Sequence, residues 1–262
     1  MDLGLSGKRA VVTGGTSGIG LATVRLLLDS GAQVAFCART AARVTELEAE
    51  LAGEYGSDRV LGRAVSVLDG PAVTAFAEEV QDAFGGCDIL VNNAGQGRVS
   101  TFADTSDDDW RAEYELKLFS QIHPVRAFKP QLEKSGGAIV VVNSLLAYQP
   151  EPHMVCTSSA RAGVQSLVKS LSVELAPRIR VNSILLGLVD SGQWQRRFAA
   201  REEKAQDRAG WYGDLAAKKG IPLGRLGEPH EAAAAILFLA SPAASYVTGA
   251  QIEVSGGLSR HI

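Results

Sequence analysis

The sequence has little cysteine and no long apolar run. Its three cysteines, Cys37, Cys87 and Cys156, are odd in number and far apart, which excludes a disulfide framework and a paired-cysteine metal site. The longest apolar run, residues 232–240, is far too short to span a bilayer. The N-terminal residues contain no long apolar region, so we expect no signal peptide and a cytoplasmic location.

Neither sign of charge dominates the composition. The formal net charge is −3 over 262 residues, which argues against nucleic acid or a membrane surface as a partner. Hydrophobic residues make up 46% and charged residues 21%, a composition typical of a globular domain. A chain of this size buries a large core, and we expect a single domain over residues 1–262.

The most informative segment is glycine-rich and lies near the N-terminus. An apolar strand at residues 10–12 is followed by Gly14, Gly18 and Gly20, which open a predicted helix. A helix N-terminus offers unpaired backbone N–H groups and the positive end of a dipole. Glycines allow a pyrophosphate to approach such a backbone closely, so this pattern predicts a dinucleotide site. The alternative interpretation is an ordinary glycine-rich turn.

Short apolar strands alternate with helical patterns along the chain. We expect strands at residues 10–12, 33–38, 59–65, 88–91, 138–142, 180–185 and 251–254. We expect further helices at residues 40–55, 71–84, 107–134, 153–175 and 229–239. Repeated strand–helix–strand order predicts an α/β fold: a doubly wound, Rossmann-type parallel sheet of about seven strands with helices on both faces.

Residues 188–220 form a charged insertion with no regular pattern. The insertion follows the carboxyl end of the sixth predicted strand, where doubly wound folds bind ligands. We expect its side chains to line a substrate pocket; the candidates are Gln193, Trp194, Arg196, Arg197, Trp211 and Tyr212. A structural lid packed by the two tryptophans is a compatible alternative.

Five segments carry motifs of one enzyme family: TGGTSGIG at residues 13–20, NNAG at 92–95, RVNS at 180–183, IPLGRLGEP at 221–229 and VTG at 247–249. With these motifs the chain resembles the short-chain dehydrogenase/reductase family over residues 6–257. The resemblance implies a doubly wound sheet, a nicotinamide cofactor, a small-molecule substrate and assembly as a homotetramer or dimer.

The residues after the second predicted strand indicate which cofactor is bound. An acidic residue there would bind the ribose 2′-hydroxyl of NAD, but this chain has Ala38 followed by Arg39. Arginine offers a phosphate a fork of charge-assisted donors, so Arg39 favours NADP(H), with Arg43 in support. A solvated surface charge is the alternative for Arg39.

The resemblance also implies the other cofactor contacts. Gly187 stands in the segment after the sixth strand, where relatives carry Pro-Gly, and Val189 and Ser191 occupy the positions that usually meet the nicotinamide carboxamide. The candidate cofactor-binding residues are Gly14, Thr16, Ser17, Gly18, Ile19, Gly20, Arg39, Asn92, Ala94, Gly95, Arg161, Gly187, Val189 and Ser191.

The catalytic positions depart from the family pattern. The family usually carries an asparagine on the long helix, a serine after the fifth strand, and a tyrosine four residues before a lysine. Here Ser144 matches the serine, whereas Lys117, Thr157 and Arg161 replace the asparagine, the tyrosine and the lysine. A threonine hydroxyl is a far weaker acid than a phenol, and arginine is effectively always protonated.

Three hypotheses address the source of the proton. One assigns it to another residue near the active loop: His153, Tyr148 or Cys156. A second assigns a relay to Lys117, whose pKa burial and Arg161 would lower, with Ser144 and Thr157 as hydrogen-bonding hydroxyls. In the third, hydride chemistry has been abandoned.

We therefore expect an NADP(H)-dependent oxidoreductase that acts on a small carbonyl or alcohol through a non-standard site. The cations Lys117 and Arg161 near Ser144 would suit an anionic substrate or a developing oxyanion. The alternatives are an NADP(H)-binding protein without redox turnover, acting as a sensor or an assembly partner, and a non-redox lyase or isomerase. No metal site is expected.

Overall fold

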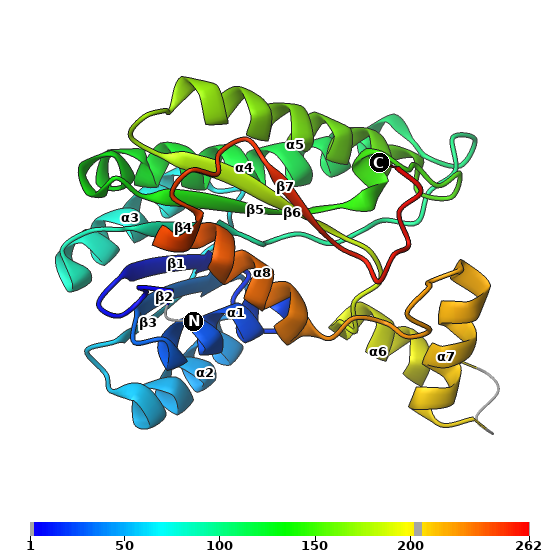
Figure 1. Ribbon diagram of the computed structural model, residues 1–262, viewed down its shortest axis with the longest axis horizontal. Helices are drawn as coiled ribbons and strands as arrows, with labels where there is room; N and C mark the ends of the chain where they lie inside the picture. The colour runs from blue at the N-terminus through cyan, green and yellow to red at the C-terminus, as the bar shows by residue number, and fades with distance from the viewer. Residues whose placement is uncertain (1–2, 202–205, 262) are drawn as a thin grey trace.

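The computed structural model describes residues 3–201 and 206–261, except for the side chains of Gln193 and Arg196, so these two pocket candidates lie outside the described part. Its centre is a seven-stranded parallel sheet (Figure 1). In spatial order the strands are β3 (Val60–Ala64), β2 (Gln33–Ala38), β1 (Arg9–Thr13), β4 (Ile89–Asn92), β5 (Ala138–Ser144), β6 (Arg180–Leu186) and β7 (Gln251–Val254).

Helices cover both faces of this sheet. One face packs against α1 (Gly18–Asp29), α2 (Ala41–Tyr55) and α8 (Pro229–Ala240). The other face packs against α3 (Gly70–Phe84), α4 (Asp107–Ser135) and α5 (Val155–Glu174). The predicted doubly wound, Rossmann-type fold is confirmed.

The apolar strands contribute to two separate cores. In β1, Val12 packs on the side of α1 and α8, whereas its neighbour Val11 packs on the side of α3 and α4. Val140 and Val141 of β5 divide in the same way. Successive strand residues point to opposite faces, and helices cover both, so residues 10–12 of β1 and 138–142 of β5 are all apolar.

The long helix α4 carries two charged residues into the interior. It begins after Ser106, whose Oγ accepts a hydrogen bond from the N–H of Asp109 at 3.2 Å, and it ends before Gly136, which has a φ of 67°. Glu113 and Lys117 lie one turn apart on its buried face. This face points towards α5 and the carboxyl ends of β4 and β5.

Residues 188–220 are not irregular, which corrects the sequence prediction. They contain α6 (Gly192–Ala199) and α7 (Arg208–Lys219). Asp207 caps α7 by accepting from the N–H of Gly210 at 2.8 Å. Two glycines within α7 and the shortness of α6 weaken the helical pattern in the sequence. Together α6 and α7 form a lobe at the lower right of Figure 1.

The lobe has its own small apolar core. Ala216 is buried there with Ile221 and Leu226. The ring centroids of Trp194 and Trp211 lie 6.3 Å apart. Within the described residues, no helix combines the length and apolar character that a membrane crossing needs.

Candidate active site

Two adjoining cavities open at the carboxyl ends of the strands. The first, of about 670 Å³, lies among the loops that follow β1, β2 and β4, and we call it the dinucleotide cleft. The second, of about 560 Å³, lies between the loop after β5, the start of α5 and the α6–α7 lobe, and we call it the catalytic pocket. The two meet at residues that line both, among them Ile19, Arg161 and Ser191.

The glycine loop of the dinucleotide cleft is held by the end of β4. The Asn93 amide nitrogen Nδ2 donates to the carbonyl oxygens of Thr13, at 2.9 Å, and Gly14, at 3.1 Å. Gly14 has a φ of +68°, and a Cβ on Gly20 would lie 2.1 Å from the Gly14 oxygen. Both positions therefore require glycine. Asn93 was not among the predicted site residues, although it belongs to the NNAG motif.

The first turn of α1 fits a pyrophosphate. Ser17 stands at the N-cap and forms no side-chain cap hydrogen bond, so the first N–H groups of the helix are left to the cleft. Gly14, Ser17 and Gly18 line the cleft beside this turn. An anion at this place would meet unpaired donors and the positive end of the helix dipole.

Arg39 lies at the other end of the cleft, directly after β2. Its side chain is exposed and has no ion-pair partner among the residues that the structure describes. Arg43, by contrast, forms an ion pair with Glu46 at 2.8 Å. Arg39 is thus the cation available to a phosphate here.

The structure distributes the predicted cofactor residues over three places. The cleft is lined by Gly14, Thr16, Ser17, Gly18, Ile19, Arg39, Ala94, Gly95, Arg161 and Ser191. Gly187 and Val189 line the catalytic pocket. Gly20 and Asn92 line neither cavity; Gly20 packs against Gly14, and the buried Asn92 donates to the Gln121 carbonyl at 3.4 Å. Successive side chains alternate at the end of β4, so Asn93, and not Asn92, faces the glycine loop.

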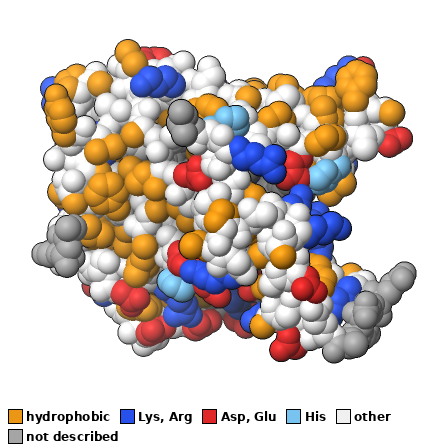
Figure 2. Space-filling model, turned by 45° about the vertical axis from the view of Figure 1, so that its right-hand side comes forward, with side chains coloured by type: hydrophobic (Ala, Val, Ile, Leu, Met, Phe, Trp, Pro, Cys, Tyr) orange, Lys and Arg blue, Asp and Glu red, His pale blue; other side chains and the backbone are white. Residues whose placement is uncertain are grey.

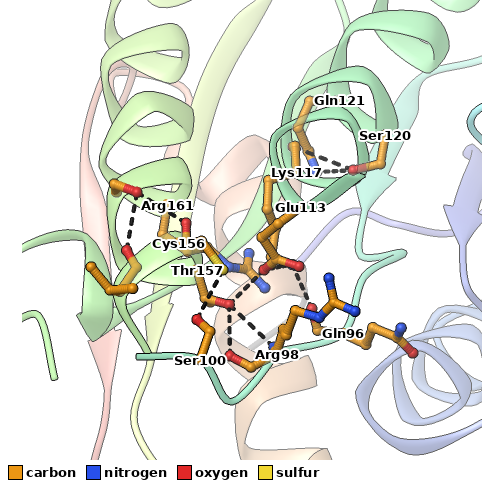
Figure 3. Close-up of polar contacts among 12 residues, drawn as sticks. Gln96, Arg98, Ser100, Glu113, Lys117, Ser120, Gln121, Cys156, Thr157 and Arg161 are labelled. Atoms are coloured by element: carbon orange, nitrogen blue, oxygen red, sulfur yellow. Dashed lines mark hydrogen bonds and ion pairs between the residues drawn. The ribbon is translucent and has the colours of Figure 1, made fainter. Parts of the chain in front are cut away.

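A buried carboxylate joins two of the predicted catalytic residues (Figure 3). Glu113 Oε1 lies 2.5 Å from Thr157 Oγ1, which donates to it, and 2.7 Å from Lys117 Nζ. Thr157 Oγ1 also accepts from the backbone N–H of Arg98 at 3.1 Å. Lys117 donates in addition to the Gln96 carbonyl. Thr157 lines the catalytic pocket, whereas Glu113 and Lys117 lie behind it and line neither cavity.

Burial lowers the pKa of Lys117 to about 8, and the Arg161 guanidinium adds to this shift. Glu113 acts in the opposite direction through its hydrogen bond and its charge, which raise the Lys117 pKa. Lys117 is therefore about half-protonated at mildly alkaline pH, which suits a general acid.

Arg161 stands between the two cavities. It donates from Nη1 to the Val142 carbonyl at 2.9 Å, and its buried Nε has no hydrogen-bond partner in the described part of the chain. Burial lowers the Arg161 pKa to about 10, so the guanidinium stays charged at neutral pH. An unpaired buried donor beside two cavities fits a ligand oxygen.

Of the remaining predicted residues, Cys156 lies beside this cluster and the others lie apart from it. Ser144 lines the catalytic pocket, and its Oγ donates to the Leu186 carbonyl at 3.3 Å. His153 is half-exposed at the pocket wall, with Nε2 3.0 Å from Glu151 Oε2. The Tyr148 hydroxyl donates to Gln251 at 2.8 Å and does not line the pocket. Cys156 is buried against the Ser100 hydroxyl at 2.9 Å.

Sequence reasoning missed Glu113. It lies one helical turn before Lys117, a spacing at which a carboxylate and an ammonium meet on one helix face. That spacing becomes informative only once Lys117 is known to point inward.

The family model described as enoyl-(acyl carrier protein) reductase matches residues 14–259. The chain is also 33% identical to 3-oxoacyl-(acyl-carrier-protein) reductase FabG of Vibrio cholerae, over 98% of this chain and 99% of that protein. With its motifs and its fold, the chain belongs to the short-chain dehydrogenase/reductase family.

Solved structures give further likenesses. The apo form of a short chain oxidoreductase from Pseudomonas aeruginosa PAO1, described as containing an atypical catalytic center, is 61% identical with a TM-score of 0.96, covering 99% of this chain and 100% of the other. Its NADPH-bound form is 60% identical with a TM-score of 0.94, covering 99% of each chain. L-Sorbose reductase from Gluconobacter frateurii, complexed with NADPH and L-sorbose, is 34% identical with a TM-score of 0.94 over the full length of both chains.

Proposed function

We propose that the protein is an NADP(H)-dependent oxidoreductase that reduces a small carbonyl compound or oxidises the corresponding alcohol. The observation that carries this proposal is the junction of the two cavities: a cleft with an open helix N-terminus meets a pocket lined by Ser144, Thr157 and Arg161. The NADPH found in solved relatives at 60% and 34% identity supports the choice of cofactor.

The chain binds NADP(H) through groups distributed along the cleft. Arg39 meets the 2′-phosphate, and the first turn of α1 meets the pyrophosphate. Arg161 holds the ribose beside the nicotinamide, as the family lysine does, while Val189 and Ser191 face the carboxamide. Bound in this way, the cofactor supplies or accepts a hydride at the junction of the two cavities.

The substrate is anionic. Among the residues that the structure describes, the cations that line the catalytic pocket are Arg161, Arg197, Lys218 and Lys219, and the carboxylate that lines it is Glu151. Figure 2 shows Lys and Arg side chains along the notch between the main body and the lobe at the lower right. A carbonyl compound carrying a carboxylate or phosphate would be attracted to such a surface.

A cofactor-binding protein without redox turnover is the second candidate. The Thr157 hydroxyl supports it, because its proton is engaged by Glu113 and its oxygen by the Arg98 N–H. We also propose that the protein assembles as a homo-oligomer, which light scattering tests.

Binding and turnover can be measured separately. Fluorescence titration with NADPH and with NADH measures affinity, and a panel of anionic carbonyl compounds is then screened for NADPH consumption. We expect NADPH to bind more tightly and to be consumed, with His153→Ala retaining turnover and Lys117→Ala losing most of it. Tight NADPH binding without consumption by any compound would favour the second candidate.

A further inference from the structure

At the junction of the two cavities the proposed reaction lacks an acid of adequate strength. His153, Lys218 and Lys219 line the catalytic pocket but not the dinucleotide cleft, and His153 and Lys219 are paired with Glu151. Thr157 has an alcohol, which cannot supply a proton near neutral pH unless another group replaces it at once. Arg161 does not deprotonate under such conditions. At this junction a proton can reach Thr157 from the buried groups behind it.

We infer that Glu113 is the positioning residue that joins Lys117 to Thr157 as a proton path into the catalytic pocket. This inference rests on the proposed function for its direction. In reduction, Lys117 gives one proton to Glu113, Glu113 gives one to Thr157 Oγ1, and Thr157 gives its own to the substrate oxygen. Lys117 ends neutral, the substrate oxygen ends as a hydroxyl, and the reverse sequence serves alcohol oxidation.

The geometry places each donor against its acceptor. Glu113 Oε1 lies within hydrogen-bond distance of both Lys117 Nζ, at 2.7 Å, and Thr157 Oγ1, at 2.5 Å (Figure 3). The side chains of Glu113 and Lys117 are only 4% and 2% exposed, so water does not replace either partner. Thr157 is the member of the three that reaches the catalytic pocket.

The surroundings of Lys117 define what can titrate with it. The charged and titratable groups that face it are Glu113 on α4 and Cys156 and Arg161 on α5. Arg98, in the loop after β4, lies beside this cluster in Figure 3 and forms an ion pair with Asp109 on α4. Arg161 opposes the charged form of Lys117, and Glu113 favours it through a hydrogen bond and a charge. Removing the Glu113 charge must therefore lower the Lys117 pKa.

The test uses Glu113→Gln, which keeps an acceptor but removes the charge, with Glu115→Gln as the matched control. Glu115 lies on the exposed side of the same helix. The first readout is the titration of Lys117 by NMR of carbon-13-labelled lysine side chains, assigned with Lys117→Ala. We expect the Lys117 pKa to fall by about one unit or more in Glu113→Gln and to stay unchanged in Glu115→Gln.

The second readout is the pH profile of kcat for carbonyl reduction. Reduction needs protonated Lys117, so kcat should decrease as pH rises through the Lys117 pKa. In Glu113→Gln this decrease should move to lower pH by the same amount, and kcat should fall by about tenfold or more. Glu113→Asp keeps the charge with a shorter reach, so it should keep the Lys117 titration while lowering kcat; it also serves if Glu113→Gln does not fold.

The outcomes separate the two proposals. An unchanged Lys117 titration in Glu113→Gln overturns the inference, whatever the enzyme turns over. A shifted titration with an unshifted kcat profile also overturns it, because Lys117 then does not supply the proton. If the Lys117 titration shifts but the protein reduces no compound, the proposed function is overturned. The result then shows only that the charges of Glu113 and Lys117 interact.

Discussion

A threonine hydroxyl occupies the position at which members of this family usually carry a tyrosine phenol. Thr157 bonds to a buried carboxylate and not to Ser144, with which the sequence grouped it. Lys117 stands where the family usually carries a neutral asparagine, and burial lowers its pKa to about 8. At the scale of single residues, the proposed proton path thus places the acid–base function behind the pocket wall.

We expect Arg39 to determine whether the protein prefers NADPH or NADH. Replacing it with aspartate removes a charge-assisted hydrogen bond to the 2′-phosphate, which is worth about 1.5–3 kcal/mol, and adds repulsion. We expect Arg39→Asp to weaken NADPH binding by about 10- to 150-fold and to leave NADH binding nearly unchanged. Fluorescence titration measures both. Arg43→Ala is the control and should have a smaller effect, because Arg43 is paired with Glu46. An unchanged preference would contradict the assignment of Arg39.

At the scale of elements, most of the architecture could be predicted from the sequence. The strand at Gln33–Ala38 and the strand at Gln251–Val254 agree with their predicted residues, because each begins at a glutamine and is followed by a polar residue, Arg39 or Ser255. The helices α6 and α7 could not be predicted, since their apolar side chains pack within a small lobe and not against the sheet. Asn93 contacts the glycine loop after β1, and Glu113 contacts Thr157 on α5. A local sequence pattern does not show such contacts between separate elements.

The glycine loop and the first turn of α1 should not tolerate a side chain at Gly20. A Cβ there meets the backbone oxygen of Gly14, so Gly20→Ala should destabilise the fold by about 1–3 kcal/mol and prevent NADPH binding. Gly53→Ala is the matched control: Gly53 lies inside α2 with open space around it, and alanine should add about 0.5–1 kcal/mol of stability. Urea unfolding compares the two, and similar effects would contradict this picture.

The α6–α7 lobe is tied to the body by an ion pair at the pocket mouth. Glu151 Oε2 lies 2.9 Å from Lys219 Nζ on α7 and 3.0 Å from His153 Nε2. Removing the carboxylate in Glu151→Gln weakens this tie by up to about 1 kcal/mol, and hydrogen exchange in α7 should become up to about fivefold faster. Glu133→Gln, which breaks a pair within α4, should leave α7 unchanged. Equal exchange rates in α7 of both variants would contradict the tie.

At the scale of the whole molecule, two central strands are joined at their amino ends by hydrogen bonds between Arg9 of β1 and Asp88, which directly precedes β4. The Asp88 carboxylate accepts three hydrogen bonds from Arg9, from the backbone N–H at 2.8 Å and from the guanidinium at 2.7 and 3.0 Å. Burial alone would raise the Asp88 pKa, but these bonds outweigh it, and the pKa lies below its ordinary value.

A carboxyl with a lowered pKa stabilises the folded state above its unfolded pKa of about 3.9, and the contribution is lost as pH falls through the folded pKa. Asp88→Asn should therefore reduce the free energy of unfolding by about 1–3 kcal/mol at neutral pH, with a difference that shrinks in acid. Urea unfolding at several pH values measures it. Asp82→Asn, at an exposed position of α3, is the control. A difference that grows in acid would be the contrary result.

The most direct test of the proposed function follows the hydride. The protein is incubated with NADPH that carries deuterium at both hydrogen positions of the reactive carbon and with a panel of anionic carbonyl compounds, and the products are analysed by mass spectrometry. We predict an alcohol that carries one deuterium on the former carbonyl carbon, with its yield reduced in Lys117→Ala. If NADPH binds tightly and no compound gains deuterium, the protein is not the carbonyl reductase proposed above.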